Sequence, residues 1–248
     1  LHDDIMDCSP LRRGKPTVFR KYDQNKAILS GDAMFACAFK YLLQCDKEVI
    51  PQLTETLTRG AIEVCEGQGF DMDFENRQTV STDEYLQMIK LKTGVLLSTA
   101  LQLGAITAKA DEKTLNLLDT FGKYIGIAFQ IKDDMLDCWS DLDTFGKVCG
   151  ADIIDRKKTF LYITALESAT QTQRQELLSL YENTTLDKDE KIQKVRAIYE
   201  QLSVAQKAQK AVEEYNSKAF EALEQIEVAP QRKATLIEVA KKLINRNK

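Results

Sequence analysis

Two groups of three aspartates share the spacing i, i+1 and i+4. The first acidic cluster is Asp3, Asp4 and Asp7 in LHDDIMD, and the second acidic cluster is Asp133, Asp134 and Asp137 in FQIKDDMLD. On a helix this spacing brings the three carboxylates toward one region in front of one face. Carboxylates without histidine or cysteine favour hard cations, and Mg²⁺ commonly combines one or two carboxylates with phosphate oxygens and water. Two such clusters on facing helices would hold a diphosphate through shared metal ions.

A single acidic cluster has an ordinary structural interpretation, because the helix dipole stabilises acidic residues at the start of a helix. The second acidic cluster does not fit this interpretation, since it follows the apolar stretch FGKYIGIAFQI deep inside a predicted helix. Adjacent buried carboxylates repel each other unless they are paired or bound to metal. The repeated spacing therefore favours a metal site over two solvated helix faces.

Basic residues accompany the acidic clusters in several short segments. They are Arg12 and Arg13 in PLRRGKPT, Lys92 in KTG, Lys147 in FGK, and Lys157 and Lys158 in DRKK. Taken singly, each is explained as a surface charge or as a lysine whose stem lies along an apolar face. Taken together, acids for metal and cations for phosphate describe a site that binds more than one polyphosphate.

Lys92 stands in an otherwise apolar segment, IKLKTGVLLSTALQLGAI. Lys90 and Lys92 are two residues apart, about 200° on an α-helix, so they cannot share a face. We expect one of them to point inward, and the KTG context selects Lys92. A lysine that loses solvation needs an anion to stay charged, and a bound diphosphate is the anion that we expect.

The composition limits the classes of protein. The chain has 248 residues, 44% hydrophobic and 29% charged, which is enough for a large core. A net charge of −4 provides no basic field for nucleic acid. One histidine, His2, and six cysteines without a CxxC pair argue against zinc. With no apolar run long enough to span a bilayer and no signal peptide, we expect a cytoplasmic protein with reduced thiols.

The hydrophobic periodicity is helical along nearly the whole chain. Helices are predicted over 25–44, 47–66 and 112–139, and another begins after the cap candidates at 81–83 and runs through KLKTGVLLSTALQLGAI. The polar stretch SDLDTFGKVCGADIIDRKK is predicted as a loop, and amphipathic helices follow it. Since Gly and Pro are scarce, 11 and 4, and no linker is visible, we expect one all-α domain over 1–248.

Several motifs together resemble the polyprenyl synthetase family, the trans-type isoprenyl diphosphate synthases. DDIMDCSPLRRG and FQIKDDMLD match the two aspartate-rich motifs of the family, and ILSGDAMFA, GQGFD, KTG and GKVCGADIIDRKKT match its other blocks in the same order. The resemblance covers Leu1 to about Leu166. It implies the isoprenoid synthase fold, a helical bundle around a central cavity, and a homodimer.

The resemblance also implies a role for each matching residue. The two acidic clusters would hold about two or three Mg²⁺ ions against the allylic diphosphate, with Asp137 acting through water. Arg13 would help to bind isopentenyl diphosphate. Thr93 and Gln130 would lie beside the reacting carbons, where they stabilise developing positive charge. The cations that would contact the allylic diphosphate or its leaving charge are Arg12, Lys92, Lys147 and Lys157.

The implied reaction is a Mg²⁺-dependent head-to-tail (1′-4) condensation of isopentenyl diphosphate with an allylic diphosphate. The pattern DDIMDxxPLRRGKPTV resembles short-chain enzymes that make C15 to C20 products. Family members carry helices before the first acidic cluster, including a Gly-Lys-Arg segment for isopentenyl diphosphate, whereas this sequence begins two residues before Asp3. We therefore expect an N-terminal part of the polypeptide, with residues that set product length, to be absent from it.

Three other classes of protein were weighed against this one. A class I terpene cyclase shares the fold and the first motif, but it has an Asn/Ser/Glu metal motif where this chain has DDMLD. A non-catalytic partner subunit usually loses one acidic cluster, and both are present here. A di-iron carboxylate bundle needs two Glu-x-x-His pairs, which one histidine cannot supply.

Overall fold

The structure is a computed structural model that describes residues 1–140 and 150–244. The chain divides into two compact units, Leu1–Thr56 and Leu57–Lys248. The expectation of one domain over the whole chain stays a prediction. The described residues are almost entirely helical, so the predicted all-α class is confirmed.

The first unit consists of short elements followed by one long helix. In chain order its elements are α1 (His2–Met6), β1 (Leu11–Arg12), β2 (Lys15–Pro16), α2 (Val18–Lys21), α3 (Gln24–Leu42) and the start of α4 (Ile50–Asn76). The two strands pair antiparallel through a turn at Arg13 and Gly14, which have φ of 54° and 72°. A tight hairpin turn needs positive φ at both central positions. No strand was predicted for this segment.

Helix α3 carries many apolar side chains and buries few of them. Ala27 is its one buried residue, whereas Leu29, Met34 and Phe35 are exposed by 67%, 66% and 49%. Asp23 caps the helix by accepting a hydrogen bond from the backbone N–H of Lys26. Large exposed apolar surfaces are typical of interfaces, so α3 is the element of this unit that most needs a partner.

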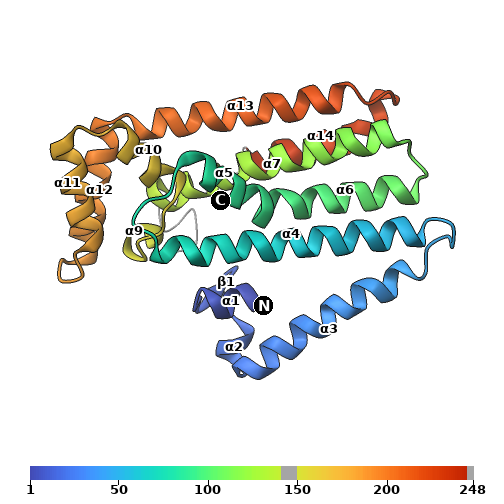
Figure 1. Cartoon of the computed structure of the whole chain (residues 1–248), viewed down its shortest axis with the longest axis horizontal. Helices are drawn as coiled ribbons and strands as arrows, with labels where there is room; N and C mark the ends of the chain where they lie inside the picture. The colour runs from blue at the N-terminus through green and yellow to red at the C-terminus, as the bar shows by residue number, and fades with distance from the viewer. Residues whose placement is uncertain (141–149, 245–248) are drawn as a thin grey trace. The chain divides into compact units, whose positions relative to one another are not determined.

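The second unit is a bundle of long helices. After the remainder of α4 its elements are α5 (Thr82–Ile89), η1 (Lys90–Gly94), α6 (Val95–Thr107), α7 (Glu112–Trp139), α9 (Ala151–Ile154), α10 (Phe160–Ser168), α11 (Gln171–Glu182), α12 (Lys188–Gln201), α13 (Val204–Glu224) and α14 (Pro230–Ile244). Helix α7 packs along both α6 and α13, and the three run side by side in Figure 1. The core of this unit therefore forms around α7, the helix that carries the second acidic cluster.

Apolar residues at helical spacing explain why α7 lies at the centre. Phe121, Ile125, Ala128 and Ile131 are all buried in the main hydrophobic cluster. Its start is fixed by Asp111, whose side chain accepts from the backbone N–H of Thr114. The observed bounds, Glu112–Trp139, agree with the predicted helix.

Two helices differ from the predictions. The long helix after residue 81 begins with a capping box of Ser81 and Glu84, as a cap there predicts, but at 90–94 it opens into one π-helical turn. Helix α4 runs to Asn76 rather than to residue 66. Gly67, inside this helix, allows close contact with η1, because a Cβ there would clash with the backbone nitrogen of Lys92.

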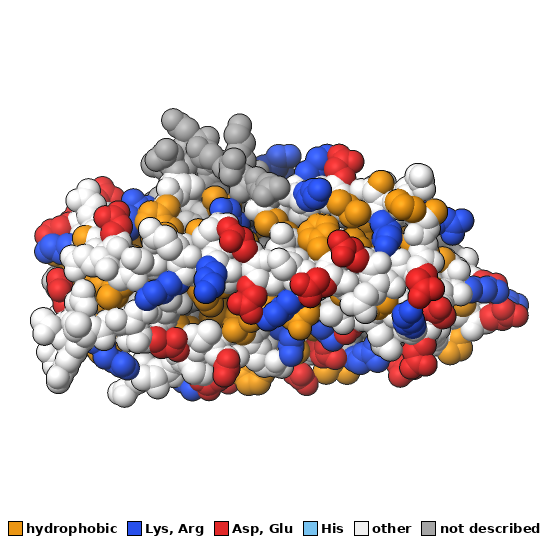
Figure 2. All heavy atoms as spheres, turned by 90° about the horizontal axis from the view of Figure 1, so that it is seen from above, with side chains coloured by type: hydrophobic (Ala, Val, Ile, Leu, Met, Phe, Trp, Pro, Cys, Tyr) orange, Lys and Arg blue, Asp and Glu red, His pale blue; other side chains and the backbone are white. Residues whose placement is uncertain are grey.

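The surface of the molecule carries mixed charge on the face shown in Figure 2. Acidic and basic side chains are interspersed there, with apolar side chains between them. Within the part of the chain that the structure describes, no helix combines the length and the hydropathy that crossing a membrane requires.

Candidate active site

The first acidic cluster lies at α1 and is held by an arginine. Asp3 and Asp4 are on the helix, Asp7 follows its last residue, and Asp4 is 3% exposed. The Arg12 guanidinium donates from Nε to Asp4 Oδ1 at 2.5 Å and from Nη2 to Asp3 Oδ2 at 2.8 Å. These bonds, above all the one to Asp4, raise the pKa of Arg12. The structure thus brings together two predicted metal ligands and one predicted phosphate contact.

The two predicted arginines have different surroundings. Arg12 uses two of its donors on the carboxylates, and a guanidinium has five N–H donors. Arg13 occupies the exposed hairpin turn. A role for Arg13 in binding isopentenyl diphosphate stays a prediction.

The second acidic cluster lies on α7, and its middle member is buried. Asp134 is 4% exposed. Its Oδ2 accepts the hydroxyl of Tyr85 at 2.6 Å and the backbone N–H of Phe160 at 3.0 Å. Its Oδ1 lies 3.4 Å from Nε2 of Gln130. Burial raises the pKa of Asp134 to about 7, while these three donors act in the opposite direction.

Asp137 joins α7 to the short helix α9. Its Oδ2 accepts the backbone N–H of Asp152 at 3.1 Å, and its carbonyl oxygen accepts the N–H of Gly150 at 2.7 Å. Asp152 adds a further carboxylate to this region. Burial raises its pKa well above the usual range, the nearby charges of Asp137 and Asp134 add to the rise, and Lys157 opposes it. The second cluster is therefore part of a larger acidic group.

Lys92 has its anion within the protein. Its Nζ donates to Asp71 Oδ2 at 2.7 Å, and both side chains are about one quarter exposed. The anion that Lys92 contacts here is the aspartate of GQGFD, and its contact with a diphosphate stays a prediction. The α-helical angle used to separate Lys90 from Lys92 does not apply, because both lie in the π-helical turn η1.

Glycines allow η1 to contact its neighbours closely. A Cβ at Gly126 of α7 would lie 2.3 Å from Cα of Gly94, the glycine of KTG. Since Gly67 of α4 contacts the backbone of Lys92, η1 is in tight contact with both helices. π-Helical turns occur frequently at functional sites, and here the turn carries Lys92 and Thr93.

Thr93 and Gln130 meet as predicted for residues of one site. Thr93 Oγ1 donates to Gln130 Oε1 at 3.2 Å, and Gln130 is one helical turn before Asp134. The contacts form a path from η1 through Gln130 to the second acidic cluster. The structure therefore brings Lys92, Thr93, Gln130 and Asp134 into one neighbourhood.

The lysines after α9 lie at the edge of the acidic group. Lys157 donates its backbone N–H to the carbonyl of Asp152, and Lys158 Nζ lies 3.5 Å from the carbonyl oxygen of Glu75. Lys147 lies outside the described residues. Because the two acidic clusters belong to different units, their facing each other also stays a prediction.

The donor set fits a hard cation. Among residues 1–140 and 150–244 no group of three or more acidic, histidine or cysteine side chains is arranged so that it could hold a metal ion. Mg²⁺ does not need one, since it takes one or two carboxylates and completes its shell with phosphate oxygens and water. Asp4 and Asp134 offer carboxylate oxygens in largely buried positions. Gln68 lies one helical turn before Asp71. In the described part, its buried Nε2 atom has no hydrogen-bond partner, which is expected of a donor that binds an anionic ligand.

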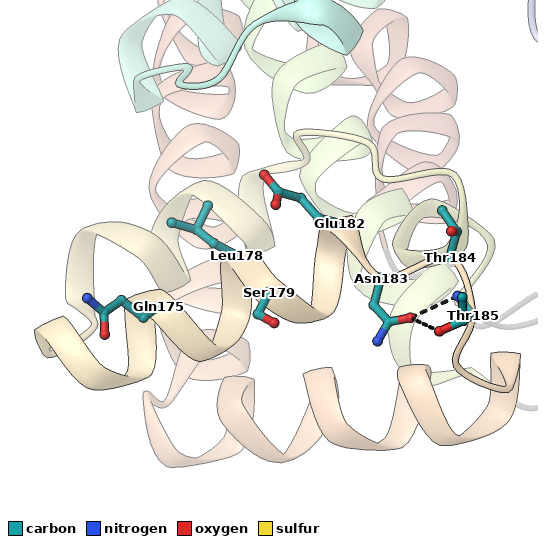
Figure 3. Close-up of a pocket in the computed structure, with 7 residues that line it drawn as sticks. All are labelled: Gln175, Leu178, Ser179, Glu182, Asn183, Thr184 and Thr185. Atoms are coloured by element: carbon teal, nitrogen blue, oxygen red, sulfur yellow. Dashed lines mark hydrogen bonds between the residues drawn. The ribbon is translucent and has the colours of Figure 1, made fainter.

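A separate hollow lies at α11 and the loop after it (Figure 3). Its volume is about 660 Å³, and none of the predicted site residues lines it. The Oδ1 atom of Asn183 accepts from the backbone N–H and the hydroxyl of Thr185, so this amide oxygen stabilises the loop. The hollow adds no group to the candidate site.

Sequence reasoning missed four residues that the structure places at the site. They are Gln68, Asp71, Tyr85 and Asp152. The first two lie in GQGFD, a motif that had been matched but not assigned a role, and Asp152 lies in the segment expected to be a loop. Tyr85 gives no signal beyond its place on the apolar face of a helix. A buried tyrosine usually finds a partner for its hydroxyl, but the sequence does not say which.

Comparison with known proteins gives matches along the chain. The model of the polyprenyl synthetase family matches residues 1–202, further than the motifs reach. A geranylfarnesyl diphosphate synthase from Natronomonas pharaonis is 43% identical over 171 residues, 66% of this chain and 49% of that protein. The chain thus spans about half the length of that relative.

Two further relatives cover the whole chain. A geranylgeranyl pyrophosphate synthase from Geoglobus acetivorans is 36% identical over 249 residues, 100% of this chain and 75% of the relative. A crystal structure of a geranylgeranyl pyrophosphate synthase superposes with a TM-score of 0.93 at 43% identity, covering 100% of this chain and 76% of that one. The predicted isoprenoid synthase fold is confirmed. By the family match and these relatives, the chain belongs to the polyprenyl synthetase family.

Proposed function

We propose that this protein condenses isopentenyl diphosphate head-to-tail (1′-4) with an allylic diphosphate, making a longer trans-polyprenyl diphosphate and releasing diphosphate. The observation that carries the proposal is the path of contacts from Asp134 through Gln130 to Thr93, beside Lys92. Carboxylates, a cation and neutral polar oxygens are the groups that this reaction needs. The names of the relatives, which include geranylgeranyl diphosphate synthases, support the same activity.

In this proposal the cations bind the diphosphate that leaves. The Lys92 ammonium, which donates to Asp71, would supply positive charge to the leaving diphosphate. Arg12 holds Asp3 and Asp4 and would also bind the diphosphate, since a guanidinium has five N–H donors. Lys147 and Lys157 complete the set, and Arg13 binds isopentenyl diphosphate.

The neutral residues act on the reacting carbons. When the allylic C–O bond breaks, both electrons leave with the diphosphate and positive charge remains on carbon. In this proposal the oxygens of Thr93 and Gln130 stabilise that charge, because preorganised dipoles act most strongly where charge develops. The double bond of isopentenyl diphosphate then attacks, and the proton that is lost passes to the departed diphosphate, since no protein base is evident among the residues that the structure describes.

We also propose Mg²⁺ as the cofactor, with about two or three ions per site. The first acidic cluster would hold ions on one side, and Asp133 and Asp134 would hold another. Asp137 acts through water, which suits a carboxylate whose Oδ2 already accepts the N–H of Asp152. Bound Mg²⁺ would stabilise the charge of the leaving diphosphate.

The remaining proposals concern the product, the assembly and the location. We propose a product of C15 to C20, which fits the relatives named geranylgeranyl diphosphate synthase. A homodimer is supported by the exposed apolar side chains of α3. We propose a cytoplasmic protein formed of one functional domain.

The experiment is incubation of the purified protein with isopentenyl diphosphate, Mg²⁺ and dimethylallyl, geranyl or farnesyl diphosphate in turn. We expect elongated diphosphates, identified by mass, with C15 or C20 as the longest main product. Absence of any elongated product with all three allylic substrates would contradict the proposed reaction.

Asp133→Ala tests the metal-binding role. We expect turnover to fall far more than the free energy of unfolding. Without bound metal, the Asp133 carboxylate is repelled by the neighbouring aspartates, so it contributes little to stability. Mg²⁺ with diphosphate should raise the melting temperature of the wild type and raise that of the variant less, since a ligand that binds only the native state stabilises it. Asp73→Ala, at an exposed aspartate of α4, is the control.

A further inference from the structure

The hydroxyl of Tyr85 is in contact with the second acidic cluster. Tyr85 lies on α5, is 3% exposed, and donates to Asp134 Oδ2 at 2.6 Å. Its ring packs near that of Phe160, with centroids 6.3 Å apart. The proposed reaction does not use this residue. Its position beside Asp134 nevertheless decides how that carboxylate is oriented.

Two donors fix one oxygen of the Asp134 carboxylate. The Tyr85 hydroxyl and the backbone N–H of Phe160, the first residue of α10, both bind Oδ2. A carboxylate held by donors from two other elements cannot rotate without losing both bonds. Oδ1 is therefore turned toward Gln130, four residues earlier on the same helix.

The oriented carboxylate in turn selects one of two orientations for the Gln130 amide. With Nε2 toward Asp134 Oδ1, the amide places Oε1 where it accepts the hydroxyl of Thr93. The reversed amide would direct its oxygen at an oxygen of the ionised Asp134 carboxylate, which has no proton to donate. The amide oxygen thus lies on the side of Thr93, and its NH₂ group lies on the side of the acid.

We propose that Tyr85 is a positioning residue that acts through Asp134 to hold the Gln130 amide with its oxygen toward Thr93. The inference rests on the proposed function, because it is the oxygen of this amide that would stabilise positive charge on the allylic carbon. The reversed amide would present N–H donors, which repel a cation. Partners one shell away from reacting groups commonly change activity by about 10- to 100-fold when they are removed.

Tyr85→Phe is the test, because it keeps the ring and removes only the hydroxyl. The first readout is the side-chain NH₂ signal of Gln130 in ¹⁵N NMR of the protein without metal or substrate, assigned by its loss in Gln130→Glu. We expect this signal to shift or split in Tyr85→Phe. The second readout is kinetic, with kcat lower by about tenfold or more and KM within about twofold, the pattern of an interaction made only in the transition state.

Tyr181→Phe is the matched control. Tyr181 is also a buried tyrosine, and its hydroxyl pairs with that of Tyr199 at 2.7 Å. The Tyr181→Phe substitution removes a buried tyrosine hydroxyl elsewhere in the same unit, and it should leave the Gln130 signal and kcat close to those of the wild type. An unchanged Gln130 signal in Tyr85→Phe, or an equal loss of kcat in both variants, would overturn the proposal.

A second variant keeps the proposal testable if Tyr85→Phe does not fold. In Asp134→Asn the amide oxygen can still accept from Tyr85 and Phe160, so its NH₂ group must face Gln130. We expect the Gln130 amide to reverse, and an unaltered Gln130 signal would overturn the proposal. Because the NMR readout uses the resting protein, it tests the positioning role even if the wild type makes no prenyl product.

Discussion

At the scale of single residues, Lys92 is paired with an aspartate in this structure and is proposed to contact the diphosphate when substrate binds. It is paired with Asp71 at 2.7 Å, and both side chains are partly exposed. Partly exposed pairs contribute at most about 1 kcal/mol to stability. The pair is therefore weak evidence for a structural role, and it leaves the ammonium able to exchange or share its anion.

Lys92→Met is expected to keep the packing of the stem and to remove the charge. We expect a clear loss of allylic diphosphate binding and of turnover, about tenfold or more because charged hydrogen bonds contribute about 1.5–3 kcal/mol each. The free energy of unfolding should change by about 1 kcal/mol or less. Calorimetric titration with the diphosphate and denaturant melts check the two expectations.

Lys90→Met is the control, since Lys90 lies in the same π-helical turn. It should bind the diphosphate and turn over nearly as the wild type does. Equal harm from both substitutions, or full activity of Lys92→Met, would contradict the assignment of Lys92.

Residue types and spacing predicted part of this site. Acidic residues at i, i+1 and i+4 indicated a metal site, because adjacent buried carboxylates repel each other unless they are paired or bound to metal. Lys92 in an apolar segment indicated a nearby anion. They could not predict that Asp71 supplies this anion, because the pairing depends on how two helices pack. Tyr85 could not be found either, since an aromatic residue on an apolar face is most simply part of the core.

At the scale of elements, the tight contact between α4 and η1 depends on one glycine of GQGFD. A Cβ at Gly67 would lie 2.3 Å from the backbone nitrogen of Lys92, whereas one at Gly69 would meet no atom within 4 Å. We expect Gly67→Ala to lower the free energy of unfolding by about 1–3 kcal/mol, the usual cost of overpacking. It should also reduce turnover, because the backbone of Lys92 has to shift.

Gly69→Ala is the matched control on the same helix. It should raise the free energy of unfolding by about 0.5–1 kcal/mol, since alanine is the better helix former. Denaturant melts of the two variants measure both effects. Equal stability of the two variants would show that α4 does not approach η1 as closely as the structure has it.

The start of α5 should depend on pH through Glu84. Bonds from the Ser81 backbone, then from Arg77 and the Ser81 hydroxyl, lower the pKa of Glu84 to about 2 from 4.5. A carboxylate with a depressed pKa stabilises the fold above its unfolded pKa and loses that effect as pH falls toward the folded pKa. We therefore expect this contribution to be full above about pH 4.5 and to disappear toward about pH 2.

Glu84→Gln isolates this contribution, because glutamine can still accept the hydrogen bond of the capping box. The variant should lose less stability than the wild type between about pH 5 and 2.5, as followed by denaturant melts at each pH. If the two stability curves run parallel over this interval, the carboxylate charge of Glu84 does not contribute.

Hydrophobic periodicity predicted the helices well where the residues that recur at helical spacing are also the buried ones. The bounds of α7 were predicted because its apolar residues recur regularly and Asp111 caps it. The π-helical turn was not predicted, and at this turn Gly67 of α4 approaches Lys92 and Gly126 of α7 approaches Gly94. Such contacts are between residues distant in sequence, and local patterns do not contain them.

At the scale of the whole molecule, the sequence predicted an all-α protein, and the helices around α7 confirm it. The arrangement of the two units is what residue patterns could not provide. The first acidic cluster belongs to one unit and the second to the other. That both clusters hold the same diphosphate is part of the proposed reaction.

The last prediction concerns the assembly of two chains through α3. Phe35 is 49% exposed on this helix, whose neighbouring apolar residues Leu29 and Met34 are exposed as well. Helices that are apolar on several sides are normally covered. A charge in such an interface loses its hydration without gaining a partner, so Phe35→Glu should dissociate a dimer that forms through α3.

Light scattering after size-exclusion chromatography should give the mass of a dimer for the wild type and of a monomer for the variant. Val239→Glu on α14, also 49% exposed, should remain dimeric. A wild type of monomer mass, or a Phe35→Glu variant that stays dimeric, would exclude α3 as the interface.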